Sequence, residues 1–221
     1  MSAGLPAAVL WDFDGTLMDT EPVWGELQGA FIRELGAELP DDFQHHTVGR
    51  PMADSVRYMA SVTGLALDVE GVAAELWARA TIAVREGPLR WSPGARELVL
   101  ALAEAGVPQA LVSTSLRSYL DAALARLPEA PFAFVVGGDE VARRKPDPEP
   151  YLTAARALGA PPDASLVIED SRSGVASGLA AGCAVLAVPT VDAFTPEGRL
   201  SVRTTLAGLT IDDLPALLAG R

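Results

Sequence analysis

Five short apolar runs recur along the chain, and segments with a helical spacing of apolar residues separate them. The runs cover residues 7–13, 109–113, 134–137, 166–169 and 184–188. Their apolarity is nearly continuous, which is typical of strands that are covered on both faces of a sheet. The pattern therefore predicts five strands of a parallel sheet.

Four helix patterns lie between these runs, at residues 94–105, 117–126, 150–158 and 174–181. Three of the patterns are followed by a glycine that favours a helix end: Gly106, Gly159 and Gly182. Because strands alternate with helices, we expect an α/β fold with a Rossmann-like parallel sheet and right-handed crossovers. A last short helix is expected within residues 210–220, with Thr210 as its N-cap.

The alternation breaks between residues 21 and 85, where the sequence has no strand pattern. Four helix patterns occupy this stretch, at residues 22–35, 41–48, 51–63 and 69–85. One face of the first carries its apolar side chains: Val23, Leu27, Ala30, Phe31 and Leu35. These patterns predict a small α-helical domain of residues 17–87, inserted into an α/β core domain of residues 1–16 and 88–221. The two connections are expected at residues 17–20 and 87–92.

Composition narrows the classes of partner. The 221 residues carry a formal charge of −12, which argues against nucleic acid because phosphate contacts need a basic surface. No apolar stretch is long enough to span a bilayer, and the N-terminus lacks a signal pattern, so no membrane partner is expected. The single cysteine, Cys183, excludes internal disulfides and fits a reducing cytoplasm. The acidic surface suits a soluble monomer or a weak homodimer.

Polar side chains stand at the ends of four predicted strands. Asp12 and Asp14 end the first, Ser113 ends the second, and Lys145 follows the third. Glu169 and Asp170 end the fourth. Ligands of open parallel sheets bind at the carboxyl ends of the strands, so these groups are expected to meet at one point.

The residue types at this point favour a metal and a phosphate. Carboxylates from two strands suit a hard cation with oxygen ligands, and Mg²⁺ is the common choice. Hydroxyls, backbone N–H groups and an ammonium suit a phosphate group. Lys145 is also the only lysine among seventeen basic residues, and a compact ammonium suits a crowded site.

Four motifs resemble those of the haloacid dehalogenase superfamily, in its order and at ordinary spacing. They read "DFDGTLMDTEP", "LVSTS", "KPDPEPY" and "VIEDSRSGV". The likeness covers nearly the whole chain. It includes the helical insert, which resembles the small α-helical cap of the subgroup that contains β-phosphoglucomutase and phosphoglycolate phosphatase.

The resemblance implies a role for each matching residue. Asp12 would be the nucleophile that forms an aspartyl-phosphate, and Asp14 the general acid and base. Ser113, or Thr114 or Ser115 in its place, would bind the phosphoryl oxygens together with Lys145. Mg²⁺ would be held by the Asp12 carboxylate, the Asp14 carbonyl, Asp170 and Glu169, the last directly or through water.

The predicted cap is expected to recognise the leaving group of the substrate. Within "HHTVGRP", Gly49 and Arg50 resemble the substrate-contacting loop of this cap type, and an arginine there suits a sugar hydroxyl or a second phosphate. Glu21 resembles the acidic residue that faces the site entrance in relatives with "DxEP". Trp24 is expected either to wall the pocket or to pack the cap.

Several functions compete. The resemblance favours a phosphatase of small phosphorylated metabolites such as sugar phosphates, and a β-phosphoglucomutase-like mutase remains the alternative. Such mutases usually carry a histidine where Trp24 stands and a lysine on the cap. This cap contains no lysine. A dehalogenase rarely has the second aspartate, and a phosphonatase needs a cap lysine. A binding module without catalysis and a receiver domain are rival classes, which the intact charged residues and the helical insert disfavour.

Overall fold

Six parallel strands form one sheet at the centre of the molecule. A computed structural model describes residues 4–47, 50–129, 131–190 and 193–219. The strand order is β3-β2-β1-β4-β5-β6, and every neighbouring pair is parallel. The strands are β1 (Ala8–Trp11), β2 (Gln109–Val112), β3 (Phe134–Val136), β4 (Ser165–Glu169), β5 (Ala184–Ala187) and β6 (Leu200–Val202). Strand β1 therefore lies in the middle, between β2 and β4.

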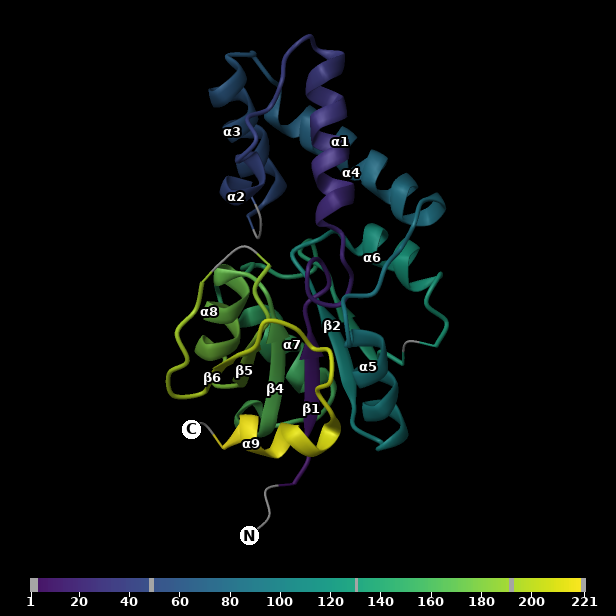
Figure 1. Ribbon diagram of the computed structural model, residues 1–221, viewed down its shortest axis with the longest axis vertical. Helices are drawn as coiled ribbons and strands as arrows, with labels where there is room; N and C mark the ends of the chain where they lie inside the picture. The colour runs from purple at the N-terminus through teal and green to yellow at the C-terminus, as the bar shows by residue number, and fades with distance from the viewer. Residues whose placement is uncertain (1–3, 48–49, 130, 191–192, 220–221) are drawn as a thin grey trace.

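Helices cover both faces of the sheet (Figure 1). In the core they are α5 (Ala95–Glu104), α6 (Arg117–Leu124), α7 (Glu149–Ala157), α8 (Arg172–Ala180) and α9 (Leu214–Leu218), with short 3₁₀ turns at Pro162–Ala164 and Ile211–Asp213. Because side chains alternate along a strand, Val9 and Trp11 pack with α5 and α6, whereas Ala8 and Leu10 pack with α7 and α8. Both faces of β1 are buried, as its continuous apolar run predicts.

Four helices form a separate layer beyond the carboxyl ends of the strands (Figure 1). They are α1 (Glu21–Glu34), α2 (Phe43–Thr47), α3 (Met52–Thr63) and α4 (Val69–Glu86), and we call them the helical unit. The unit has its own apolar cluster around Ile32, Val56 and Leu76. It shares no strand with the sheet, in agreement with the helical stretch expected from the sequence.

Two antiparallel chain segments join the helical unit to the core. Met18 and Trp91 form an isolated β-bridge, and the Asp19 amide donates to the Arg90 carbonyl at 2.9 Å. In the opposite direction, the Ser92 amide donates to the Leu17 carbonyl at 3.0 Å. These contacts join residues 17–19 to residues 90–92.

Some details differ from expectation. Strand β6 was not predicted, because its three residues form no continuous apolar run and only Leu200 among them is buried. Leu35 lies beyond the end of α1 and is 47% exposed, while Gln28 on the same helix is buried. Thr210 stands at the expected start of the final helical segment, where its amide and hydroxyl both donate to the Asp213 carboxylate.

Within the described ranges, every helix is too short or too polar to cross a membrane.

Candidate active site

The end of β1 places Asp12 against the neighbouring strand. Its amide donates to the Ile168 carbonyl of β4 at 3.0 Å. The backbone that carries the carboxylate is therefore held by the sheet. Directly after Asp14 the chain turns at Gly15, whose φ of 81° favours glycine. A Cβ at Gly15 would overlap the Asp170 carboxylate, so this glycine also makes room for the acidic end of β4.

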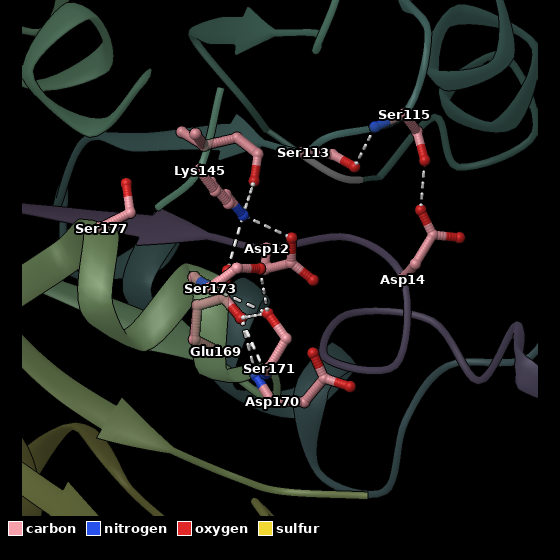
Figure 2. A network of polar contacts seen from close by, with 12 residues as sticks. Asp12, Asp14, Ser113, Ser115, Lys145, Glu169, Asp170, Ser171, Ser173 and Ser177 are labelled. Atoms are coloured by element: carbon pink, nitrogen blue, oxygen red, sulfur yellow. Dashed lines mark hydrogen bonds and ion pairs between the residues drawn. The ribbon is translucent and has the colours of Figure 1, made fainter. Parts of the chain in front are cut away.

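Lys145 joins the two neighbouring strand ends. Its ammonium lies 2.6 Å from Asp12 Oδ1 and 2.6 Å from Glu169 Oε1, and it also donates to the Val112 carbonyl at 2.8 Å (Figure 2). All three donor positions of the ammonium are thus used, and its side chain is 2% exposed. Burial alone would lower the pKa of Lys145, but the charges of Asp12 and Glu169 more than offset this and raise it above its ordinary value.

Glu169 is completely buried and surrounded by donors. Oε1 accepts from Lys145 and from the Tyr151 hydroxyl at 2.9 Å. Oε2 accepts from the amides of Asp170 and Ser171 and from the Ser171 hydroxyl, at 3.0–3.1 Å. These five hydrogen bonds satisfy both oxygens without an ion, so Glu169 here positions Lys145 and the start of α8.

The carboxylates outnumber the cation at this site. Ligand oxygens of Asp12, Glu169 and Asp170 lie within 4.8 Å of one another. Burial, followed by the charge of Glu169, raises the pKa of Asp12 to about 8, with Lys145 opposing. Burial and then the charges of Asp12 and Glu169 raise the pKa of Asp170 well above its usual range. One ammonium does not balance three buried carboxylates, and this donor set fits a hard divalent cation such as Mg²⁺.

Asp14 is held in a different direction from Asp12. Its Oδ2 accepts from the Ser115 hydroxyl at 2.5 Å, so the carboxylate turns toward the end of β2 (Figure 2). Its Oδ1 accepts from Thr20 at 2.8 Å and from the Trp24 indole and Tyr119 hydroxyl at 3.2 Å each. Four donors from the connection, the helical unit and the core therefore fix the orientation of this one carboxylate.

The hydroxyl groups of Ser113 and Ser115, which follow β2, make different contacts. The Ser113 oxygen accepts from the Ser115 amide at 3.0 Å, which leaves the hydroxyl proton of Ser113 available to a ligand. The hydroxyl of Ser115 is already used by Asp14. Thr114 lies between them and lines a pocket between the strand ends and the helical unit.

A hydroxyl on the opposite side links Glu21 to Asp170. The Thr190 oxygen lies 2.6 Å from Glu21 Oε1 and 3.0 Å from Asp170 Oδ2. Glu21 begins α1, so the first residue of the helical unit is tied to the acidic cluster through the loop after β5.

A pocket lies between the helical unit and the carboxyl ends of the strands. Asp12, Asp14, Ser113, Lys145 and Asp170 form its core side. Arg50 lines it from the helical unit but is exposed, and Gly49 lies outside the described residues. Trp24 both lines the pocket and packs edge-on against Trp77, with ring centroids 5.0 Å apart.

Sequence reasoning did not identify several residues that line this pocket or hydrogen-bond to its acidic side chains. They include Gln28, Gln44, Thr47, Ser55, Tyr119, Arg144, Tyr151 and Thr190. Two of them have partners that are remote in the sequence: Tyr119 is 105 positions from Asp14, and Thr190 is 169 positions from Glu21. Gln28 did carry a signal, because it is a polar residue beside the apolar face of α1.

Comparison with known proteins identifies relatives over most of the chain. The family model for haloacid dehalogenase-like hydrolases matches residues 9–188. Hexitol phosphatase A of Escherichia coli (strain K12) is 33% identical over 194 residues, which cover 81% of each protein. A bifunctional riboflavin kinase/FMN phosphatase of Arabidopsis thaliana is 32% identical over 189 residues, covering 85% of this chain. The chain spans only about half of that relative, 49% of its length.

The fold is also found among solved structures. The crystal structure of CbbY from Rhodobacter sphaeroides in complex with phosphate aligns with a TM-score of 0.82. The alignment covers 95% of this chain and 99% of CbbY at 22% identity, so it shows a common fold.

Proposed function

Because this chain belongs to the haloacid dehalogenase-like hydrolase family, we propose that it is a magnesium-dependent phosphatase of a small phosphate monoester, a sugar phosphate or a related metabolite. The observation that carries the proposal is the buried cluster of Asp12, Lys145 and Asp170 on the core side of the pocket. Related phosphatases of known substrate, such as hexitol phosphatase A, support the class of reaction.

Asp12 is the proposed nucleophile. Its carboxylate oxygen attacks the phosphorus atom, the bond from phosphorus to the leaving oxygen breaks, and an aspartyl-phosphate forms. Lys145, fixed at 2.6 Å from Asp12, offsets negative charge as the phosphoryl group approaches. The Ser113 hydroxyl and the N–H groups after β2 donate to the phosphoryl oxygens.

Asp14 is the proposed general acid and base. It gives a proton to the leaving oxygen in the first step and takes one from water in the second, when water attacks phosphorus and frees Asp12. Four donors fix the Asp14 carboxylate on the core side of the pocket, and one of them, the Trp24 indole, comes from the helical unit. We therefore propose that residues 17–87 act as a cap that completes the site over the core domain of residues 1–16 and 88–221.

Mg²⁺ is proposed to bind between Asp12 and Asp170, with the Asp14 carbonyl as a further ligand. When bound, it supplies positive charge that keeps the nucleophile ionised and polarises the phosphoryl group. Glu169 is the least suited of the four expected ligands, because both its oxygens already accept hydrogen bonds. We assign it a supporting role behind Lys145 and Ser171.

A mutase remains the second candidate, since it would use the same aspartyl-phosphate. Trp24 favours hydrolysis, because its indole donates to Asp14 where such mutases usually carry a histidine. Incubation with β-glucose 1-phosphate and a 1,6-bisphosphate primer separates the two. A phosphatase releases inorganic phosphate, whereas a mutase accumulates glucose 6-phosphate.

The first prediction concerns the nucleophile and the metal. With p-nitrophenyl phosphate and Mg²⁺ we expect turnover that falls about 1,000-fold or more in Asp12→Asn, because an amide cannot form the covalent intermediate. Chelation of Mg²⁺ should remove turnover, and added Mg²⁺ should restore it.

Asp163→Asn is the matched control, because Asp163 is an exposed carboxylate at the opposite end of β4. It should keep the activity of the unmodified protein. Turnover that survives both Asp12→Asn and chelation would refute the proposed mechanism.

A further inference from the structure

The helical unit contributes an inner wall to the pocket that is polar but neutral. Its members are Gln28 on α1, Gln44 and Thr47 on α2, and Ser55 on α3. Gln28, Thr47 and Ser55 are 4%, 6% and 3% exposed, so most of the surface of these residues is covered by the protein. We call them the polar wall.

Two members of the polar wall have unused hydrogen-bonding groups. The Gln28 carbonyl oxygen accepts from the Gln44 amide at 3.0 Å, but the Gln28 amide nitrogen has no partner among the described residues. The Ser55 hydroxyl has no partner in the same part of the chain. Both residues line the pocket, so these unused groups are available to a ligand that enters it.

The positive side chains that line the pocket beside this wall are exposed or engaged with the core. On the helical unit, Arg50 is exposed and Glu21 is engaged with Thr190. Arg144 and Lys145 belong to the core side, where they donate to Gly138 and to the acidic cluster. A second phosphate or a carboxylate seated against the polar wall would therefore be desolvated without a buried cation beside it. Alcohol hydroxyls fit, because they donate to and accept from amides and hydroxyls.

Apolar surface lies beside the polar wall. The rings of Trp24 and Trp77 pack edge to face, and both line the pocket together with Met52. An apolar surface next to donors and acceptors suits a carbon skeleton that carries several hydroxyl groups.

We propose that the polar wall binds the uncharged, polyhydroxylated part of the substrate, so that the enzyme prefers a sugar or polyol monophosphate over a phosphate ester with a second anionic group. The inference rests on the proposed phosphatase function and narrows its substrate class. Gln28 and Ser55 are its specificity-determining residues, and neither takes part in the bond-breaking step.

The experiment compares kcat/KM over four substrates with Mg²⁺: a hexitol monophosphate, a hexose 1,6-bisphosphate, phosphoglycolate and p-nitrophenyl phosphate. We expect the hexitol monophosphate to exceed the bisphosphate and phosphoglycolate by about 10-fold or more. Ser55→Ala and Gln28→Met should each lower kcat/KM for the hexitol monophosphate about 10-fold, as expected for a lost hydrogen bond in a buried site. Turnover of p-nitrophenyl phosphate, which has no hydroxyl, should change less than about 3-fold.

Ser61→Ala is the matched control, since Ser61 is an exposed serine on the same helix and donates to the Tyr58 carbonyl. It should leave kcat/KM for all four substrates unchanged.

Preference of the unmodified enzyme for phosphoglycolate or the bisphosphate would overturn the inference, even if a variant failed to fold. Equal loss on all substrates in Ser55→Ala and Gln28→Met would also overturn it. Failure of the phosphatase proposal is distinct, because p-nitrophenyl phosphate would then turn over independently of Mg²⁺ and Asp12.

Discussion

Lys145 holds two buried carboxylates, and each would lose its counter-charge if the lysine were replaced. Asp12 is needed for the proposed chemistry, whereas Glu169 only accepts hydrogen bonds from within the core. Glu169 thus holds the Lys145 ammonium in a position from which it also contacts Asp12, the proposed nucleophile. Removing one member of a buried ion pair usually costs more than the pair contributes, because the remaining charge stays buried.

Lys145→Met is therefore expected to lower the free energy of unfolding of the metal-free protein by about 3–5 kcal/mol. Arg143→Met is the control from the same segment. Arg143 pairs with Asp147 and Glu149, but its side chain is 70% exposed, so the expected loss is about 1 kcal/mol or less. Urea unfolding followed by circular dichroism measures both, and equal losses would contradict the assigned role of Lys145.

Helix α8 illustrates how an element can be shaped by the group it packs against. Its first turn begins at Ser171, whose oxygen accepts from the Gly174 amide at 3.1 Å. A Cβ on Gly174 would overlap the Glu169 carboxylate, which occupies the space beside the helix. A glycine that weakens the helix by about 1 kcal/mol is thus required by the buried carboxylate.

Gly174→Ala is expected to destabilise the protein by about 2 kcal/mol or more through overpacking, although alanine is the better helix former. Gly25→Ala on α1 is the matched change. Its Cβ would lie 3.5 Å from Gln44, an ordinary contact, so stability should stay the same or rise by up to about 1 kcal/mol. Thermal unfolding of the two variants decides the point, and a Gly174→Ala protein as stable as Gly25→Ala would contradict it.

The elements show what could be predicted from sequence and what could not. Strands β1, β2, β4 and β5 are buried throughout, so their apolar runs were sufficient to locate them, and the α/β fold is confirmed. Strand β6 depends on pairing with β5 and leaves no such run. The residues expected at the strand ends do come together, but the donors that orient Asp14 could not be anticipated. Ser115 and Tyr119 reach it from 101 and 105 positions away, and only the folded sheet brings them close.

At the scale of the whole molecule, the acidic cluster lies where the helical unit and the core meet. Asp170 contacts Thr190, and Thr190 contacts Glu21 at the start of α1. A cation bound beside Asp170 binds only the folded chain, because its proposed ligands come from β1 and from the end of β4. Such binding stabilises the whole fold by mass action.

Mg²⁺ at about 100 times its dissociation constant is expected to add about 2.7 kcal/mol, which is about 5–10 °C in Tm for a chain of this size. Differential scanning calorimetry with and without chelator measures the shift. Asp170→Asn should lose most of it, while Asp163→Asn should keep it. An equal shift in the two variants would mean that Mg²⁺ acts on the acidic surface in general.

The central place of β1 has a consequence for the order in which the molecule is made. Val9 pairs with Gln109 and with Leu166, so its partners are synthesised 100 and 157 residues later. At about 5–20 residues per second, this strand waits roughly 5–20 s for its first partner and roughly 8–30 s for its second. The helical unit is translated in the interval and can assemble around Ile32 and Leu76 while the sheet is still incomplete. During each round of translation an apolar strand thus stays unpaired for seconds, a window in which the nascent chain is open to chaperones and to aggregation.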